Sequence, residues 1–117
     1  MNIHLFDKDQ QAETLPAGRA VFREGDRGDH MFAVLEGAVD IIVRNKTVET
    51  VEAGGVFGEM ALVEEQPRIA SAIVRSNARL VRIDRKRFMF LVQQNPFFAL
   101  QLMTVMAERL RRMDEKL

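Results

Sequence analysis

Short apolar runs separated by turn residues fill the first three-quarters of the chain. The runs are rich in Val, Ile and Phe, with Gly, Asp and Asn between them, and they read AVFREG, MFAVLEG, AVDIIV, TVETVEA, ASAIV and ARLVRID. Such runs are typical of β-strands. Val39, Ile41 and Val43 alternate with Asp40 and Ile42, which predicts one apolar face. Six or so closely spaced strands favour an antiparallel barrel, roll or sandwich.

Three glycines mark the turns of this predicted β region. Gly25 and Gly28 lie in EGDRGD, and Gly37 lies in LEGAV. Because glycine has no Cβ, it tolerates positive φ angles and close approach of neighbouring groups. We therefore expect each of the three to occupy such a position.

The last quarter of the chain changes to a helical pattern. Phe88, Leu91 and Val92 recur at the spacing of one helix face, and Asp84 is suited to cap the start of that helix. The sequence predicts a single domain over residues 1–117. Its β region spans about 16–84 and its C-terminal helices about 85–117.

A second helix is predicted to begin at Asn95-Pro96 and to run to about Met113 or beyond. It carries two apolar stripes. The first is Phe98, Leu102 and Val105, and it stops at the polar residues Glu108, Arg109 and Arg112. The second has a 4-3-4-3-4 spacing and consists of Ala99, Met103, Met106, Leu110, Met113 and Leu117.

We expect the first stripe to pack on the β-domain. The second stripe has heptad spacing, and we expect it to meet the same helix of another copy in a homodimer. The alternative is that both stripes pack on the domain itself. Arg109, Arg111 and Arg112 form a basic cluster, which the helix dipole alone accounts for.

Composition excludes several classes of function. The chain has 117 residues, enough for one core and too few for two. Acidic and basic residues balance at 17 each, so nothing indicates nucleic acid or an anionic membrane as an obligatory partner. Cysteine is absent, and the two histidines, His4 and His30, are far apart. We therefore expect no metal, no cofactor and no catalysis.

The N-terminal segment MNIHLFDKDQQ lacks the basic start and apolar run of a signal peptide. No apolar run approaches the ~18 residues that a membrane span needs. We therefore expect a cytoplasmic protein.

The segment GGVFGEMALVEEQPRIAS, residues 54–71, is the strongest candidate for chemistry. Gly58 before Glu-Met-Ala-Leu indicates a strand or loop that breaks into a short helix, whose N-terminus has unpaired N–H groups and a partial positive charge. Glycine lets a ligand approach closely, so the turn at Gly58 to Leu62 can hold one phosphate. Arg68 adds a fixed charge and a planar fork of donors that suits phosphate oxygens.

Glu59 makes the prediction more specific. A carboxylate beside a phosphate is repelled unless a group such as a ribose hydroxyl donates a hydrogen bond to it. One acid, one arginine and several N–H groups suit a cyclic nucleotide better than a triphosphate, which usually needs a P-loop and a metal. No P-loop is present. The alternative is that Glu59 and Arg68 form an ordinary surface ion pair.

Two stretches carry a family resemblance: Phe57-Gly58-Glu59-Met60-Ala61-Leu62 and Pro67-Arg68-Ile69-Ala70-Ser71. They resemble the phosphate-binding cassette of the cyclic-nucleotide-binding domain family. This family includes regulatory subunits of cyclic-AMP-dependent kinases, gated ion channels and bacterial catabolite-activator-type regulators. The resemblance covers residues 16 to 95 well, and the terminal helix resembles the family's hinge and dimerisation helices.

The resemblance implies a mainly β fold, an antiparallel, jelly-roll-like β-roll with flanking C-terminal helices. Glu59 would then accept from the ribose 2′-hydroxyl, helped by the Gly58 backbone, and Arg68 would pair with the cyclic phosphate. The amides of Ala61, Ile69 and Ala70 would complete the phosphate site, and Met60 would lie in the same turn. Ile69 stands where many cyclic-GMP binders carry Thr or Ser, which favours cyclic AMP over cyclic GMP.

The function expected from this resemblance is that of a stand-alone bacterial sensor. It would bind a cyclic nucleotide and relay occupancy through its C-terminal helix to an effector that the sequence does not identify. The alternative is a degenerate domain without ligand that serves as a dimerisation or scaffold module.

Overall fold

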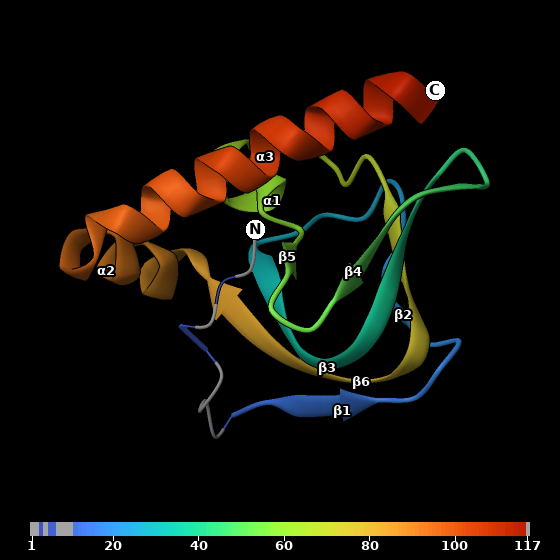
Figure 1. Ribbon diagram of the computed structural model, residues 1–117, viewed down its shortest axis with the longest axis horizontal. Helices are drawn as coiled ribbons and strands as arrows, with labels where there is room; N and C mark the ends of the chain where they lie inside the picture. Colours follow the sequence, from blue (N-terminus) through green and yellow to red (C-terminus); the bar gives the residue numbers. More distant parts are fainter. Residues whose placement is uncertain (1–2, 4, 7–10, 117) are drawn as a thin grey trace.

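A computed structural model describes residues 3, 5–6 and 11–116 of the chain (Figure 1). In chain order the elements are β1 (Glu13–Leu15), β2 (Ala20–Phe22), β3 (His30–Val43), β4 (Lys46–Glu52), β5 (Val56–Phe57), α1 (Met60–Val63), β6 (Ser71–Asp84), α2 (Arg85–Gln94) and α3 (Pro96–Lys116).

The six strands form one antiparallel sheet whose centre is the β3–β6 pair. The order is β1-β6-β3-β4, while β2 pairs with β6 and β5 pairs with β3. Figure 1 shows the long strands curving into a roll, with α3 lying along one side of it and α1 and β5 beneath that helix. The predicted antiparallel β-roll with C-terminal helices is therefore confirmed.

The strand boundaries differ from the prediction in two places. β3 and β6 are each continuous over 14 residues, where the sequence suggested two shorter strands for each. Gly37 lies inside β3 with φ +80°, and the β3–β6 register shifts on both sides of it. A bulge bends a strand without ending it. Gly37, which was expected in a turn between two strands, therefore bends β3 and does not end it. The short strand β1 was not predicted. Before Gly58 the sequence indicated either a strand or a loop, and the structure has the short strand β5 there.

Two apolar cores lie on opposite faces of the sheet. The core inside the roll includes Phe32, Val34, Val39, Val48, Val74 and Leu80. The core between the roll and the helices includes Met31, Val56, Leu62, Val81, Ile83 and Phe98. The predicted alternation is confirmed, because Val39, Ile41 and Val43 are all buried inside the roll.

The helix boundaries agree with the sequence pattern. The Asp84 carboxylate accepts a hydrogen bond of 2.8 Å from the Arg87 amide, which confirms Asp84 as the N-cap of α2. Asn95 joins the two helices, since its amide donates to the Leu91 carbonyl and its carbonyl accepts from the Phe98 amide. α3 then begins at Pro96, as predicted.

The first apolar stripe of α3 packs on the roll as predicted, because Phe98, Leu102 and Val105 are all buried. The apolar stripe itself ends at Val105 as predicted, but the buried face of the helix continues beyond it. Arg109 continues the same 4-3-4 spacing and is 9% exposed, so the domain buries an arginine one helical turn beyond Val105.

The second stripe of α3 is divided between the domain and solvent. Met106 packs against the core between the roll and the helices, and Met113 packs against the core inside the roll. Met103 and Leu110, in contrast, are 62% and 63% exposed. Leu117 lies outside the described residues. The predicted uniform seam is therefore wrong, because the roll covers part of it. The dimer itself stays a prediction. None of the helices in the described part of the chain is long and apolar enough to cross a membrane.

The bend in β3 leads to a stability prediction. A Cβ on Gly37 would lie 2.2 Å from the Asn77 carbonyl oxygen, in addition to the strain of φ +80°. Gly18, at φ +88°, has open space around it. Positive φ costs a non-glycine residue about 1–2 kcal/mol, so urea unfolding should show about that loss for Gly18→Ala. Gly37→Ala should lose more, about 3 kcal/mol or above. Equal losses would contradict the close approach.

Candidate functional site

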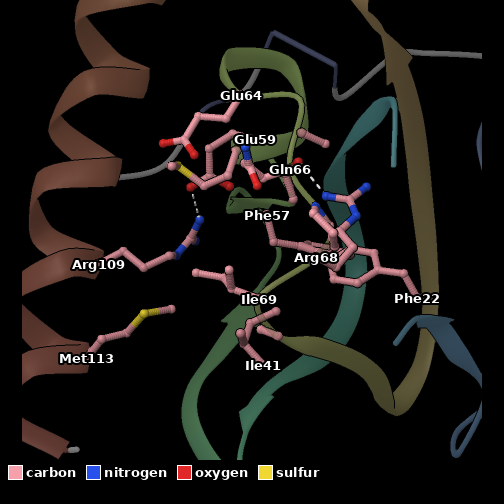
Figure 2. Close-up of a pocket in the computed structure, with 15 residues that line it drawn as sticks. Phe22, Ile41, Phe57, Glu59, Glu64, Gln66, Arg68, Ile69, Arg109 and Met113 are labelled. Atoms are coloured by element: carbon pink, nitrogen blue, oxygen red, sulfur yellow. Dashed lines mark hydrogen bonds and ion pairs between the residues drawn. The ribbon is translucent and has the colours of Figure 1, made fainter. Parts of the chain in front are cut away.

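A pocket of about 220 Å³ lies between α3, the turn before α1 and the strands beneath them (Figure 2). All seven residues expected from the sequence line it: Gly58, Glu59, Met60, Ala61, Arg68, Ile69 and Ala70. Phe22, Ile41, Arg109 and Met113 also line it, from other parts of the fold. The fold thus gathers the predicted residues around one cavity.

The backbone of Arg68 is fixed by the loop between β2 and β3. Its amide donates to the Asp26 carbonyl and its carbonyl accepts from the Gly25 amide, both at 2.8 Å. Its side chain lies against Gly28, where a Cβ would come within 2.3 Å of Nε. Gly25 has a positive φ angle, and Gly28 allows the Arg68 side chain to approach closely. Both are features that the sequence led us to expect of these glycines.

Two backbone carbonyls hold the guanidinium of Arg68. Nη1 donates to the Gly58 carbonyl at 2.8 Å, and Nη2 donates to the His30 carbonyl at 2.7 Å. The ring of Phe22 lies 4.0 Å from the guanidinium carbon. Nε is buried and has no hydrogen-bond partner in the described part of the chain. Arg68 therefore offers an oriented positive charge with no carboxylate hydrogen-bonded to it.

Burial lowers the pKa of Arg68, because an apolar environment disfavours the charged form. The nearby carboxylates Glu59, Asp29 and Asp26 act in the opposite direction. An arginine side chain nevertheless keeps its proton in proteins. The consequence is a poorly solvated cation, which an anion entering the pocket would stabilise.

Gly58 lets the turn close over this cation. Its φ is +77°, and a Cβ there would lie 3.0 Å from Arg68 Nη1 and 3.2 Å from Phe22. The turn continues into α1, so the predicted short helix is confirmed. The Ala61 amide donates a long bond of 3.4 Å to the Gly58 carbonyl.

The amides of Ile69 and Ala70 lie beside Arg68 in the chain. Neither is a donor in the turn and loop hydrogen bonds of the described residues. Two amides thus accompany the cation, while the Ala61 amide already has a weak partner. This donor arrangement suits an anion with several oxygens.

Glu59 is a buried carboxylate, 3% exposed, and it accepts a hydrogen bond from Nη1 of Arg109 (Figure 2). The alternative of a surface ion pair between Glu59 and Arg68 is therefore wrong. Arg109 also donates from Nη2 to the Val56 carbonyl at 2.6 Å. On its other side it donates to Glu49, from Nε at 2.8 Å and from Nη2 at 3.1 Å.

Burial acts to lower the pKa of Arg109, but the hydrogen bonds and charges of Glu49 and Glu59 outweigh it and raise the pKa above its ordinary value. Arg109 therefore stays charged between the two carboxylates. A buried charge is tolerated when it is paired and fully hydrogen-bonded. The helix dipole is thus the wrong explanation for this member of the basic cluster.

Arg109 and Glu49 were not predicted as part of the site. A signal for Arg109 exists in the sequence, because it continues the buried spacing of Phe98, Leu102 and Val105. Glu49 has no such signal. It follows Val48 in an ordinary strand, and its partner is 60 residues away.

The opposite wall of the pocket is apolar. Ile69 is 61% exposed although it is an isoleucine, and it lies near Ile41 and across from Met113 of α3 (Figure 2). Charged groups at one end and apolar side chains at the other suit a small ligand with an anionic part and a flat apolar part.

No group of three or more metal-ligating side chains lies together among the residues that the structure describes. His4 lies outside those residues. The absence of a metal and of a cofactor therefore stays a prediction.

A comparison with known protein families identifies the class of this protein. Residues 12–95 match the model of the cyclic nucleotide-binding domain, and the chain belongs to that family. The family is one of ligand-binding regulatory domains, in agreement with the expectation of a non-catalytic chain.

Individual relatives are similar over nearly the whole chain. The cyclic AMP receptor protein of Thermus thermophilus is 30% identical over 92% of this chain. The crystal structure of Thermus thermophilus catabolite activator protein has a TM-score of 0.80, with 30% identity over 91% of this chain. The structure described as cAMP bound PfPKA-R has a TM-score of 0.78, with 27% identity over 90% of this chain and 36% of its own. The chain spans 52% of the length of each Thermus protein.

The contact between Gly28 and Arg68 leads to a binding prediction. Gly28→Ala should displace the guanidinium and weaken cyclic-nucleotide binding at least about tenfold, with little change in urea stability because φ is not positive there. Titration calorimetry would measure the loss.

A matched control removes the side chain that the new methyl group would meet. In an Arg68→Ala background, Gly28→Ala should weaken binding no further. Unchanged affinity of the single Gly28→Ala variant would contradict this role of Gly28.

Proposed function

We propose that this chain binds cyclic AMP in the pocket between α1, the loop that precedes β6 and α3, and that it acts as a regulatory sensor. The observation that carries the proposal is the guanidinium of Arg68, which two carbonyls orient and to which no carboxylate of the described residues is hydrogen-bonded. A singly charged cyclic phosphate matches this cation in charge and in its planar pair of oxygens.

The neighbouring groups match the rest of the ligand. The amides of Ile69 and Ala70 are suited to the phosphate, with Ala61 and Met60 in the turn beside them. Glu59 is suited to accept from a ribose hydroxyl, and its bond to Arg109 reduces the repulsion between its carboxylate and the phosphate. Ile69, Ile41 and Met113 are suited to cover a purine base.

Two observations favour cyclic AMP over cyclic GMP. Ile69 offers no hydroxyl group to a guanine at the position after the arginine. The relatives are described as a cyclic AMP receptor protein and as a cAMP-bound protein. Both nucleotides belong in the test, because they share the ribose and the phosphate.

The C-terminal helix is suited to relay occupancy. Arg109 and Met113 of α3 line the pocket, so a bound ligand changes the surroundings of this helix. A ligand that prefers one helix position shifts the population toward that position. The effector stays unidentified. We place the protein in the cytoplasm, where a cyclic nucleotide would reach it.

Titration calorimetry of cyclic AMP and cyclic GMP into the wild type tests the proposal. Cyclic AMP should bind at least as tightly as cyclic GMP. Arg68→Ala should lose about 1.5–3 kcal/mol, roughly tenfold to more than a hundredfold in affinity. Arg75→Ala is a control, since Arg75 is an exposed arginine of the following strand, β6, where it pairs with Asp40. If a folded, ligand-free wild type binds neither nucleotide, the scaffold alternative replaces this proposal.

We also propose that α3 forms a homodimer with a second copy. Its exposed face carries Phe97, Leu100, Met103 and Leu110, and exposed apolar patches mark interaction surfaces. In sedimentation equilibrium, Met103→Glu with Leu110→Glu should halve the mass of the wild type. Val63→Glu, an exposed apolar position on α1, should leave the mass unchanged. A monomeric wild type would overturn the dimer.

A further inference from the structure

Glu49 holds Arg109 more completely than Glu59 does. Both oxygens of Glu49 accept from Arg109, at 2.8 Å from Nε and 3.1 Å from Nη2. Glu59 accepts from Nη1 alone. The side chain of Glu49 is only 12% exposed, and a second arginine, Arg112, lies 3.6 Å from it. Glu49 is therefore a nearly buried carboxylate with a two-point grip on a pocket residue.

Glu49 itself does not line the ligand pocket. It lines a separate polar groove on the other side of Arg109, together with Glu52, Glu108 and Arg112. Arg109 is common to both cavities. Apart from its charge, Glu49 can thus act on a ligand in the pocket only through the guanidinium of Arg109.

The geometry of a guanidinium makes that influence specific. The group is planar and rigid, so fixing Nε and Nη2 also fixes the direction of Nη1. Nη1 is the atom that donates to Glu59 (Figure 2). We propose that Glu49 is a positioning residue: it orients Arg109, which holds the Glu59 carboxylate for the ligand, and it ties α3 to β4. This inference rests on the proposed function.

The sign of the effect separates positioning from simple charge. A carboxylate near an anionic ligand repels it, so removal of the charge of Glu49 would by itself tighten binding. Loss of positioning has the opposite effect, because Arg109 and Glu59 would no longer be held in place before the ligand arrives. The inference requires binding to weaken.

A pair of matched variants on β4 tests this. Glu49→Gln keeps the size of the side chain and removes its charge. Glu52→Gln makes the same change at an exposed glutamate of the same strand and groove, whose side chain has no hydrogen bond or ion pair with the described residues. In titrations with cyclic AMP, Glu49→Gln should bind about tenfold more weakly than Glu52→Gln. Circular dichroism should show both variants folded.

A double-mutant cycle distinguishes positioning from a general structural role. In an Arg109→Met background, Glu49→Gln should change the affinity no further, because the residue through which it acts is gone. An equal loss in both backgrounds would overturn the inference. So would a Glu49→Gln variant that binds as tightly as Glu52→Gln, or more tightly.

A measurement without ligand keeps the inference separate from the proposed function. Hydrogen exchange of the α3 amides from Val105 to Met113 should be faster in Glu49→Gln than in Glu52→Gln, because one tie between α3 and β4 is weakened. If the wild type binds no cyclic nucleotide, the proposed function fails. The exchange rates alone then decide whether Glu49 holds the helix, and equal rates would overturn that role.

Discussion

The buried guanidinium of Arg109 connects the two parts of this molecule. It lies on α3, yet its hydrogen-bond partners among the described residues are on the roll or the turn before α1: Glu49, Glu59 and the Val56 carbonyl. Without these partners a desolvated arginine would be costly. The position of α3 and the chemistry of the pocket therefore depend on each other, because the same side chain holds the helix on the roll and lines the pocket.

The other charged group of the pocket is held in a contrasting way. Arg68 is oriented by the carbonyls of Gly58 and His30, and Gly28 and Gly58 leave it the space it needs. Carbonyls orient a cation without neutralising it, whereas carboxylates do both. The pocket thus keeps one positive charge available and one balanced, which is the arrangement that a singly charged ligand with a neutral hydroxyl-bearing part requires.

The sequence predicted the residues whose chemistry is local. Glu59 and Arg68 are nine positions apart in one short segment of the chain, so their pattern is visible without a fold. Arg109 was missed because its partners are 50 and 60 residues away, and only the packing of α3 brings them together. For a related reason, the sequence pattern suggested two short strands in place of each of the long strands β3 and β6. Gly37 permits a bulge as readily as a turn, and only the pairing with β6 decides between them.

If Arg68 and the turn around it hold a cyclic phosphate, the bound ligand must change the surroundings of the Arg68 Nε–H group. Nitrogen-detected NMR of the arginine Nε–H groups during a cyclic AMP titration measures this change. We expect the resonances of Arg68 Nε and of the Ile69 and Ala70 amides to shift together and saturate, while the Nε resonance of the exposed Arg75 does not move. Saturable shifts elsewhere that leave Arg68 and these amides unchanged would contradict this placement of the phosphate.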